Sequence, residues 1–207
     1  MPKGETTRRE REKLRHRREI LDAALLLFSE HGFHNVSMQM VAATAEFGTG
    51  TLYSFFRNKE DLYHTLIVEL ADRFHQTLTN AIGSGSDEIE NLRNYVTAKA
   101  LVFSANLNVV RLYYRETTGA SFNFKAGLAS EIRAQHTAHL EGLARVFADG
   151  IKKKQFNRIA DPYFLALTLD SLTNAILLGS LEDLESRPYP HDPDELLNIF
   201  FKGLLVA

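Results

Sequence analysis

The most constraining feature of the sequence is the stretch from Ser37 to Asp61, where two short helical patterns are followed by the start of a third. Ser37 is a good N-cap, and apolar residues follow it at helical spacing: Met38, Val41, Ala42 and Ala45. The pattern breaks at Glu46-Phe47-Gly48 and resumes from Thr49 to Phe56. A short helix, a tight turn and a second short helix predict a helix-turn-helix.

The second of these helices is expected to have one apolar face and one face rich in hydroxyl groups. The apolar face consists of Leu52, Phe55 and Phe56, and the hydroxyl face of Thr49, Thr51, Tyr53 and Ser54. Eight helical residues rise about 12 Å, which suits the major groove of B-DNA. Hydroxyl groups on such a helix can contact phosphates and base edges.

A third helix is expected to begin at Asn58, a good N-cap, with Asp61 at the position of a capping-box acid. Lys59 would then project from a helix start that is already electropositive, where a phosphate is favoured. The alternative is that Asn58 to Asp61 is only a well-capped helix start. Its position next to the helix-turn-helix favours the phosphate interpretation.

These residues together give the segment from Ile20 to Leu66 a family resemblance. The matching parts are the opening helix Ile20 to Phe33, the helix start at Ser37, the stretch Gly50-Thr51-Leu52-Tyr53 with Phe56, and Asn58 to Leu62. This segment resembles the DNA-binding domain of the TetR family of bacterial one-component regulators.

The resemblance implies roles for individual residues. Thr49, Thr51 and Tyr53 would contact phosphates or bases, and Lys59 would hold a phosphate. Gln39 occupies a position that reads a base in some members. The predicted DNA-binding residues are therefore Ser37, Gln39, Thr49, Gly50, Thr51, Tyr53, Ser54 and Lys59.

Two residues depart from the family pattern. Glu46 stands where the family usually has Gly, so either the turn holds a strained left-handed residue or its geometry differs locally. Gln39 replaces an Arg found in some members. A Gln can pair bidentately with adenine, or it can face water.

The length of 207 residues and the 44% hydrophobic content allow a small domain joined to a larger one. We expect a basic N-terminal arm over residues 1–18, the helix-turn-helix domain over 19–64, and a helical effector-binding and dimerisation domain over 65–207. The absence of Cys excludes disulfides and thiolate metal sites. A charged N-terminus and the lack of a long apolar run predict a soluble cytoplasmic protein without a signal peptide or membrane span.

The formal net charge of -2 conceals an uneven distribution. Residues 1–18 contain eight Lys or Arg and three Glu, a surplus of five positive charges. A basic arm directly before a helix-turn-helix suits an extension that tracks phosphates or reaches a groove. The alternative is a disordered, solvated segment.

The rest of the sequence predicts further helices and no strand, so the predicted fold class is all-α. A helix from Asn58 to about Ile82 is succeeded by the turn Gly83 to Ser86, and helices are expected around 89–103, 107–114 and 128–153. Residues 118–127 would form a connection. A helix that begins in the DNA-facing domain and runs for about 37 Å must pack against the later helices at its far end, so it would link the two domains.

The helix around 128–153 carries His136 and His139 on an otherwise apolar face. Such a pair can act as metal ligands, as polar groups in a ligand pocket, or as hydrogen-bonded histidines in ordinary packing. No third ligand is near in the sequence, so no metal site and no cofactor are predicted. Tyr114, His136 and Asn174 are the first candidates for effector binding.

The last two helices have clear starts at Asp161-Pro162 and Asp192-Pro193, with the connection Ser186 to Pro190 between them. The final helix is apolar on all sides, so it must be covered on two of them. A second subunit is the simplest cover. We therefore predict a homodimer through the helices about 161–185 and 192–205, and the family resemblance implies the same interface.

The predicted function is a ligand-responsive, sequence-specific DNA-binding transcriptional regulator, a repressor that a small molecule releases from its operator. Its partner would be a near-palindromic double-stranded operator. The alternative is a helical small-molecule carrier or an enzyme that retains a helix-turn-helix. The sequence lacks the HExxH, GxSxG and phosphate-loop motifs and a Cys nucleophile, which disfavours an enzyme with catalytic residues.

Overall fold

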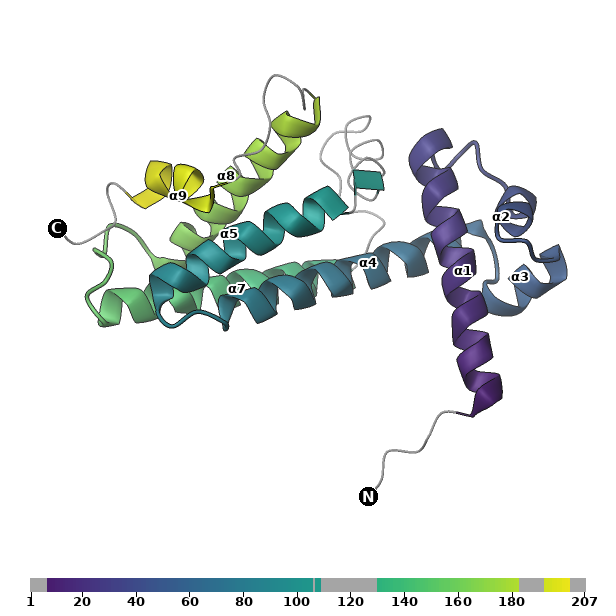
Figure 1. Ribbon diagram of the computed structural model, residues 1–207, viewed down its shortest axis with the longest axis horizontal. Coiled ribbons are helices and arrows are strands. Elements are labelled where there is room, and N and C mark those ends of the chain that lie inside the picture. The colour runs from purple at the N-terminus through teal and green to yellow at the C-terminus, as the bar shows by residue number, and fades with distance from the viewer. Residues whose placement is uncertain (1–6, 106, 109–129, 183–191, 202–207) are drawn as a thin grey trace. The chain divides into compact units, whose positions relative to one another are not determined.

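The computed structural model describes residues 7–105, 107–108, 130–182 and 192–201 (Figure 1). These residues form helices and no β-strand, which confirms the all-α prediction. The helices are α1 (Arg8–His31), α2 (Met38–Thr44), α3 (Thr49–Phe55), α4 (Lys59–Ile82), α5 (Glu88–Ala105), α7 (Ser130–Lys152), α8 (Pro162–Glu182) and α9 (Pro193–Phe201). None of the helices in the described ranges is long and apolar enough to cross a membrane.

The described residues divide into two compact units, and the division falls within α4 between Leu70 and Ala71. The N-terminal unit contains α1, α2, α3 and the first half of α4. The C-terminal unit contains the second half of α4 with α5, α7, α8 and α9. The predicted helix 107–114, the connections 118–127 and 186–190, and the end of the last predicted helix lie wholly or largely outside the described residues.

The first helix begins earlier than the sequence analysis expected. A capping box starts it at Arg8: Thr7 Oγ1 accepts from the Glu10 N–H, and the Glu10 carboxylate accepts from the Thr7 N–H at 2.7 Å. Residues 8–18 are therefore the first turns of α1, and the alternative of a disordered segment is wrong for them. The described part of the basic segment has a fixed helical geometry.

This basic part of α1 is anchored to the rest of the N-terminal unit. Arg17 forms an ion pair with Glu69 of α4, and its guanidinium lies 5.7 Å from the ring centroid of Phe56. The His16 ring lies 4.9 Å from that of Phe47 in the turn after α2. At its other end α1 stops before Gly32, which has φ 78° and caps the helix as predicted.

The helix-turn-helix has the predicted caps and an unusual turn. Ser37 Oγ accepts from the Met40 N–H and starts α2. The helix ends in a Schellman motif, in which the Phe47 N–H bonds to Ala42 O at 2.9 Å and the Glu46 N–H to Ala43 O at 3.1 Å. Glu46 has φ 59°, so the turn holds a left-handed non-glycine residue. The first of the two interpretations of Glu46 is confirmed.

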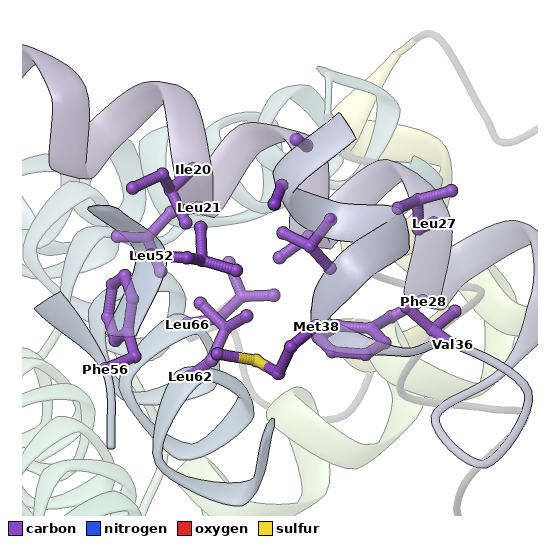
Figure 2. Close-up of a cluster of buried hydrophobic side chains, with 14 residues drawn as sticks. Ile20, Leu21, Leu27, Phe28, Val36, Met38, Leu52, Phe56, Leu62 and Leu66 are labelled. Atoms are coloured by element: carbon purple, nitrogen blue, oxygen red, sulfur yellow. The ribbon is translucent and has the colours of Figure 1, made fainter. Parts of the chain in front are cut away.

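A single hydrophobic core holds α3 in place within the N-terminal unit. Figure 2 shows side chains from α1, α2, α3 and α4 converging on one cluster. Leu52 of α3 is completely buried in it, with Phe56 immediately after the helix. Leu62 and Leu66 reach the same cluster from α4. The core therefore fixes which face of α3 points outward.

The C-terminal unit has its own core, in which α7 packs against α8 and α5, and α5 against α9. Gly150 near the end of α7 allows a close approach, because a Cβ there would lie 2.2 Å from the Phe156 ring. The predicted N-caps are confirmed: Asp161 accepts from the Tyr163 N–H, and Asp192 accepts from the Asp194 N–H, each at 2.9 Å.

Replacing Glu46 with Gly is expected to stabilise the protein. A left-handed conformation is strained for a side chain with a Cβ, by roughly 1–2 kcal/mol, and the extra freedom of Gly in the unfolded state offsets part of that gain. We expect E46G to increase the free energy of unfolding by about 0.5–1 kcal/mol in urea titrations. The control A43G, inside α2, should decrease it by about 1 kcal/mol; equal effects of the two variants would contradict the strain at Glu46.

Candidate functional site

The outer face of α3 carries the hydroxyl groups that the sequence predicted. Thr49, Thr51, Tyr53 and Ser54 are all exposed, whereas Leu52 on the opposite side is buried. Within the described residues, the structure contains no hydrogen bond from the side chains of Thr49, Thr51 or Tyr53. The Ser54 hydroxyl is different, because it donates to Thr51 O at 2.6 Å. Three hydroxyl groups are thus available to a partner, and Ser54 can still accept.

Four of the predicted residues lie around one open pocket of about 440 Å³ on the N-terminal unit. They are Ser37, Gln39, Tyr53 and Lys59. Its wall is completed by His34, Asn35, Val36, Met38 and Asn58. The pocket therefore joins the start of α2, the middle of α3 and the start of α4, three parts of the chain that the sequence analysis had assigned to DNA binding separately.

Lys59 makes contacts that the sequence did not predict. Its ammonium group donates to Phe33 O at 2.8 Å and to Val36 O at 2.9 Å, and it lies 4.4 Å from the centroid of the Phe33 ring. A longer contact joins it to His34 O at 3.5 Å. Lys59 thus binds the carbonyl groups that come after α1, and a phosphate contact at Lys59 remains a prediction.

The start of α4 is capped as expected, with one difference. Asn58 Oδ1 accepts from the Asp61 N–H at 2.7 Å, whereas Asp61 Oδ2 accepts from the N–H of Arg57, one residue before the expected partner. That hydrogen bond, together with the nearby Arg57 guanidinium, lowers the pKa of Asp61. Gly50 has no such local role: a Cβ there would meet no protein atom within 4 Å. Nothing inside the described protein requires glycine at this exposed position of α3.

In the C-terminal unit, two of the three predicted effector-binding residues meet at one carboxylate. Asp170 Oδ2 on α8 accepts from Asn174 Nδ2 at 3.1 Å and faces His136 Nε2 of α7 at 3.5 Å. The third, Tyr114, lies outside the described residues. The sequence analysis therefore selected residues around a polar cluster whose central member, Asp170, it did not identify.

The centre of this cluster is a buried ion pair between Lys99 of α5 and Asp170. Lys99 is fully buried, and its Nζ lies 2.5 Å from Asp170 Oδ1. It also contacts Tyr95 OH at 3.1 Å, Asp170 O at 3.0 Å and Thr173 Oγ1 at 2.7 Å. Tyr95 OH donates to Asp170 Oδ1 at 2.7 Å. Every hydrogen of the ammonium group has an acceptor.

Burial and pairing act against each other on these two charges. Burial raises the pKa of Asp170, but donors from His136, Lys99 and Tyr95 and the Lys99 charge outweigh it and hold that pKa well below its ordinary value. Burial lowers the pKa of Lys99, and the Asp170 charge opposes that shift. The low pKa keeps the Asp170 carboxyl ionised at neutral pH, where it lies 2.5 Å from Lys99 Nζ.

His139 of α7 lies against this cluster without a hydrogen bond. His139 is only 4% exposed, and neither of its ring nitrogens has a hydrogen-bond partner among the described residues. The ring stacks on Tyr95 with centroids 5.5 Å apart and lies 5.6 Å from the ring of His75 on α4. Burial lowers the pKa of His139 to about 4. Its imidazole is therefore neutral at physiological pH.

The three interpretations of the histidine pair can now be compared. In the described part of the chain, no group of three His, Cys, Asp or Glu side chains could hold a metal ion. His136 is nearly half exposed and faces Asp170, whereas His139 is buried. The two side chains thus have different surroundings, and only His139 has unpaired polar atoms in the interior.

Sequence reasoning missed Lys99, Tyr95, Asp170, Thr173 and His75. One signal was available: Asp170 stands within the strongly apolar sequence of α8, where an unpaired carboxylate would be unfavourable. Its partner could not be chosen, because many Lys residues precede it in the chain. Tyr95 and Lys99 are four residues apart, so both lie on one face of α5. This spacing points to Asp170 as their common partner only when the position of α8 is known.

Comparisons with known proteins agree with this geometry. Residues 20–66 match the family described as bacterial regulatory proteins, tetR family. The chain is 30% identical over 101 residues to the HTH-type transcriptional regulator HbdR of Aromatoleum sp. (strain CIB), which covers 49% of this chain and 44% of HbdR. The matched part of this chain spans less than half the length of each of the first curated relatives.

Solved structures resemble almost the whole chain. The fatty acid degradation regulator FadR of Bacillus halodurans has a TM-score of 0.76 at 20% identity and covers 91% of this chain and 95% of its own. FadR of Bacillus subtilis in complex with stearoyl-CoA has a TM-score of 0.75 at 19% identity, over 90% and 98% of the two chains. At such identities the likeness establishes the fold.

The fold and the exposed face of α3 define a helix-turn-helix protein with a larger helical C-terminal part. Residues 20–66 are similar to the tetR family of bacterial regulatory proteins, and the helical fold of the chain is that of solved TetR-family regulators. This is a family of transcriptional regulators, not of enzymes.

Breaking the buried pair is expected to destabilise the C-terminal unit strongly. K99M leaves the Asp170 carboxylate buried without its counter-ion, which should lower the free energy of unfolding by about 3–5 kcal/mol. The double variant K99M/D170L removes both charges and should recover most of this loss. The control R93M breaks the half-exposed pair with Asp194, 2.6 Å apart, and should cost less than about 1 kcal/mol.

Stability is expected to fall as the pH decreases from 6.5 towards 4. An unfolded His takes up a proton near pH 6.5, whereas folded His139 does so only near pH 4. The unfolded state then binds more protons, so His139 alone should lower the free energy of unfolding by about 2 kcal/mol between pH 7 and pH 5. His75, whose pKa burial also lowers, acts in the same direction.

The matched variant for this pH effect is H139Q, which does not titrate in that range. Urea titrations at pH 7 and pH 5 should show a smaller loss of stability for H139Q than for the wild type. H31Q, at an exposed position on α1, should behave as the wild type. An equal loss in H139Q and wild type would mean that His139 is protonated in the folded protein above pH 5.

Proposed function

We propose that the protein is a ligand-responsive, sequence-specific DNA-binding transcriptional regulator that represses until a small molecule releases it from its operator. The observation that supports this most is the exposed face of α3. Its hydroxyl groups point outward because Leu52 and Phe56 are held in the core on the other side. An outward helix of this kind inserts into the major groove in the helix-turn-helix proteins.

Within this proposal the predicted residues have two kinds of contact. Gln39, Thr49 and Thr51 would contact base edges, and Tyr53 and Lys59 would contact phosphates around their shared pocket. Gly50 would let the DNA backbone come close to α3. The N-terminal turns of α1, with exposed Arg and Lys side chains, would add phosphate contacts that weaken with salt. A cytoplasmic location is in keeping with the proposed DNA partner.

We further propose a symmetric dimer through α8 and α9. One face of α8 is exposed along its length: Phe164, Leu167, Ser171, Ala175 and Gly179. The apolar residues at its start are unusual for a solvent-facing surface, and the small residues after them let another helix come close. Ile199 of α9 is 70% exposed. Two copies would present two α3 helices to a near-palindrome with half-sites about 34–36 Å apart or a multiple of it.

The effector would bind in the C-terminal unit at the cluster around Asp170 and His139. B. subtilis FadR was solved with stearoyl-CoA, which shows that a relative in fold takes a small molecule. Effector binding can release the DNA only if the effector binds more tightly to a state in which the two α3 helices of the dimer no longer fit the operator. The cluster would then serve binding and not catalysis, and Lys99, fully paired, would have no role as a nucleophile.

Selection from random DNA duplexes at moderate salt tests the DNA-binding proposal. The wild type should enrich one near-palindrome. T51V keeps the shape of the side chain but removes its hydroxyl, and it should weaken binding to that sequence by about 10-fold, as expected for one lost base contact. The matched control T97V alters an exposed Thr on α5 and should bind as the wild type. Wild-type protein that enriches no sequence would refute the proposal.

The dimer proposal is tested by adding charge to the exposed apolar face. F164K and I199K should shift the protein to monomers in sedimentation experiments and weaken operator binding. Both should remain folded, because Phe164 is 63% exposed and Ile199 70% exposed. The control L101K changes an equally exposed leucine on α5 and should leave the dimer intact. Dimeric F164K and I199K variants would place the interface elsewhere.

A further inference from the structure

The first two turns of α1 project beyond the rest of the N-terminal unit. Residues 8–15 are all exposed, whereas His16 and Arg17, which follow them, contact the rings of Phe47 and Phe56. Figure 1 shows this end of α1 extending past α2 and α3. Eight helical residues are about 12 Å long. We call residues 8–15 the overhang; the family match over residues 20–66 does not include it.

The rotation of the overhang about the helix axis is fixed by the contacts that follow it. The His16 ring lies 4.9 Å from the Phe47 ring, and Ile20 is completely buried in the core. Seven residues are close to two full turns of an α-helix. Arg9 therefore lies on the same face as His16, and Lys13 on the same face as Ile20. Both cations start from the face of α1 that is turned towards the helix-turn-helix.

Two other cations of α1 lie on the opposite face. Arg18 is exposed and precedes Ile20 by two residues, which is a rotation of about 200°. Arg11 lies two turns before Arg18, on the same outward face. The helix thus carries an inward pair, Arg9 and Lys13, and an outward pair, Arg11 and Arg18. The two pairs have equal charge and differ in the direction in which they leave the helix.

The helix α1 lies directly behind α3. Figure 2 shows Leu52 of α3 next to Ile20 and Leu21 of α1 in the core that they share. Packed helices have axes about 8–10 Å apart, and the major groove of B-DNA is about 8.5 Å deep. When the exposed face of α3 reaches the floor of the groove, α1 is therefore at about the height of the phosphates that border the groove.

The helix α1 crosses α3 and does not run along it. Phe47, just before α3, and Phe56, just after it, contact the adjacent residues His16 and Arg17 of α1. Both ends of α3 thus lie at the same level of α1. The overhang, which continues from this level, leaves the groove that α3 occupies and passes over its edge. Its length of about 12 Å corresponds to about four base pairs.

The chemistry of the inward pair suits phosphates and not base edges. The overhang contains five Lys or Arg and two Glu, a surplus of three positive charges. The carboxylate of Glu10 accepts from the Thr7 N–H and so stays beside the helix cap. Long cationic side chains at the height of the backbone reach phosphate oxygens, whereas the floor of the groove is about 8.5 Å deeper. Such contacts add affinity without reading sequence.

We propose that Arg9 and Lys13 bind backbone phosphates of the DNA that flanks the segment read by α3, over about four base pairs. This inference rests on the proposed function, because it assigns a second contact on the same DNA. The outward pair, Arg11 and Arg18, makes no such contact. The protein therefore holds its operator more tightly when the duplex continues past the sequence that α3 selects.

Three duplexes test where the contact falls. The first ends at the outermost base pair that the wild type enriches in selection. The second continues on each side for about six base pairs of arbitrary sequence, which exceeds the reach of the overhang. The third carries uncharged methylphosphonates in these extensions. The full-length protein should bind the second duplex about 10-fold more tightly than the first, and the third as weakly as the first. Equal affinity for the first two, or for the last two, overturns the proposal.

Two charge-matched variants identify the side chains. R9Q/K13Q removes the inward pair and should lose the preference for the second duplex. It should also reduce the slope of log K against log salt by about 1.8 for each bound subunit. R11Q/R18Q removes the outward pair and should keep the preference, with less than about half of that change in slope. Equal effects of the two variants would mean that only net charge matters, and would overturn the assignment.

Leu14, which is 59% exposed, separates a rigid overhang from a flexible arm. L14P keeps every charge and lets α1 begin near residue 14, but it interrupts the helix before that residue. It should therefore bind the three duplexes as R9Q/K13Q does. L14A keeps the helix and should behave as the wild type. A wild-type preference in L14P would overturn the rigid placement of the two cations.

The result is separable from the test of DNA binding itself. R9Q/K13Q should still enrich the wild-type sequence in duplex selection, because α3 is unchanged, and enrichment of a different sequence would overturn the phosphate assignment. A wild type that enriches a near-palindrome but binds the first two duplexes equally would refute the overhang contact and leave the regulatory function standing. A wild type that enriches no sequence would refute the regulatory function and this inference with it.

Discussion

The constraint on which the structure depends is that one helix belongs to two hydrophobic cores. Leu62 and Leu66, near the start of α4, are buried with α1, α2 and α3, and Leu78, near its end, is buried with α5, α7, α8 and α9. Each core buries its own part of α4. A change in the way either core packs on α4 therefore acts on an element that the other core also needs.

The two cores differ in how their polar groups are satisfied. In the N-terminal unit, Lys59 binds the free carbonyl groups after α1, and the helix caps use short local contacts. In the C-terminal unit, Lys99 and Asp170 join α5 to α8 across the interior, far apart in the sequence. A buried pair of this kind is weak evidence for added stability. Next to this pair, His139 is neutral because it is buried, and its ring nitrogens have no hydrogen-bond partner in the part of the chain that the structure describes.

Much of the N-terminal unit could be predicted from the sequence because its signals are local. Ser37, Gly32 and Asn58 mark helix ends through contacts within a few residues, and all three act as predicted. The start of α1 was missed although Thr7 and Glu10 have capping-box spacing, because the dense charges of that segment are equally typical of an unstructured arm. The cluster around Asp170 could not be predicted, since Lys99 is 71 residues away in the chain and only the packed helices bring the two together.

The capped start of α1 has a consequence for the thermodynamics of association. A basic tail without structure loses conformational entropy when it becomes ordered on a polyanion, but residues 8–18 are already helical. Their charges are held at fixed rotations around a rigid axis, so only one side of the helix can face a given surface. Binding through this segment would then show a small heat-capacity change. The segment would also tolerate little variation in the curvature of its partner, because a rigid helix cannot follow a bend as a flexible chain does.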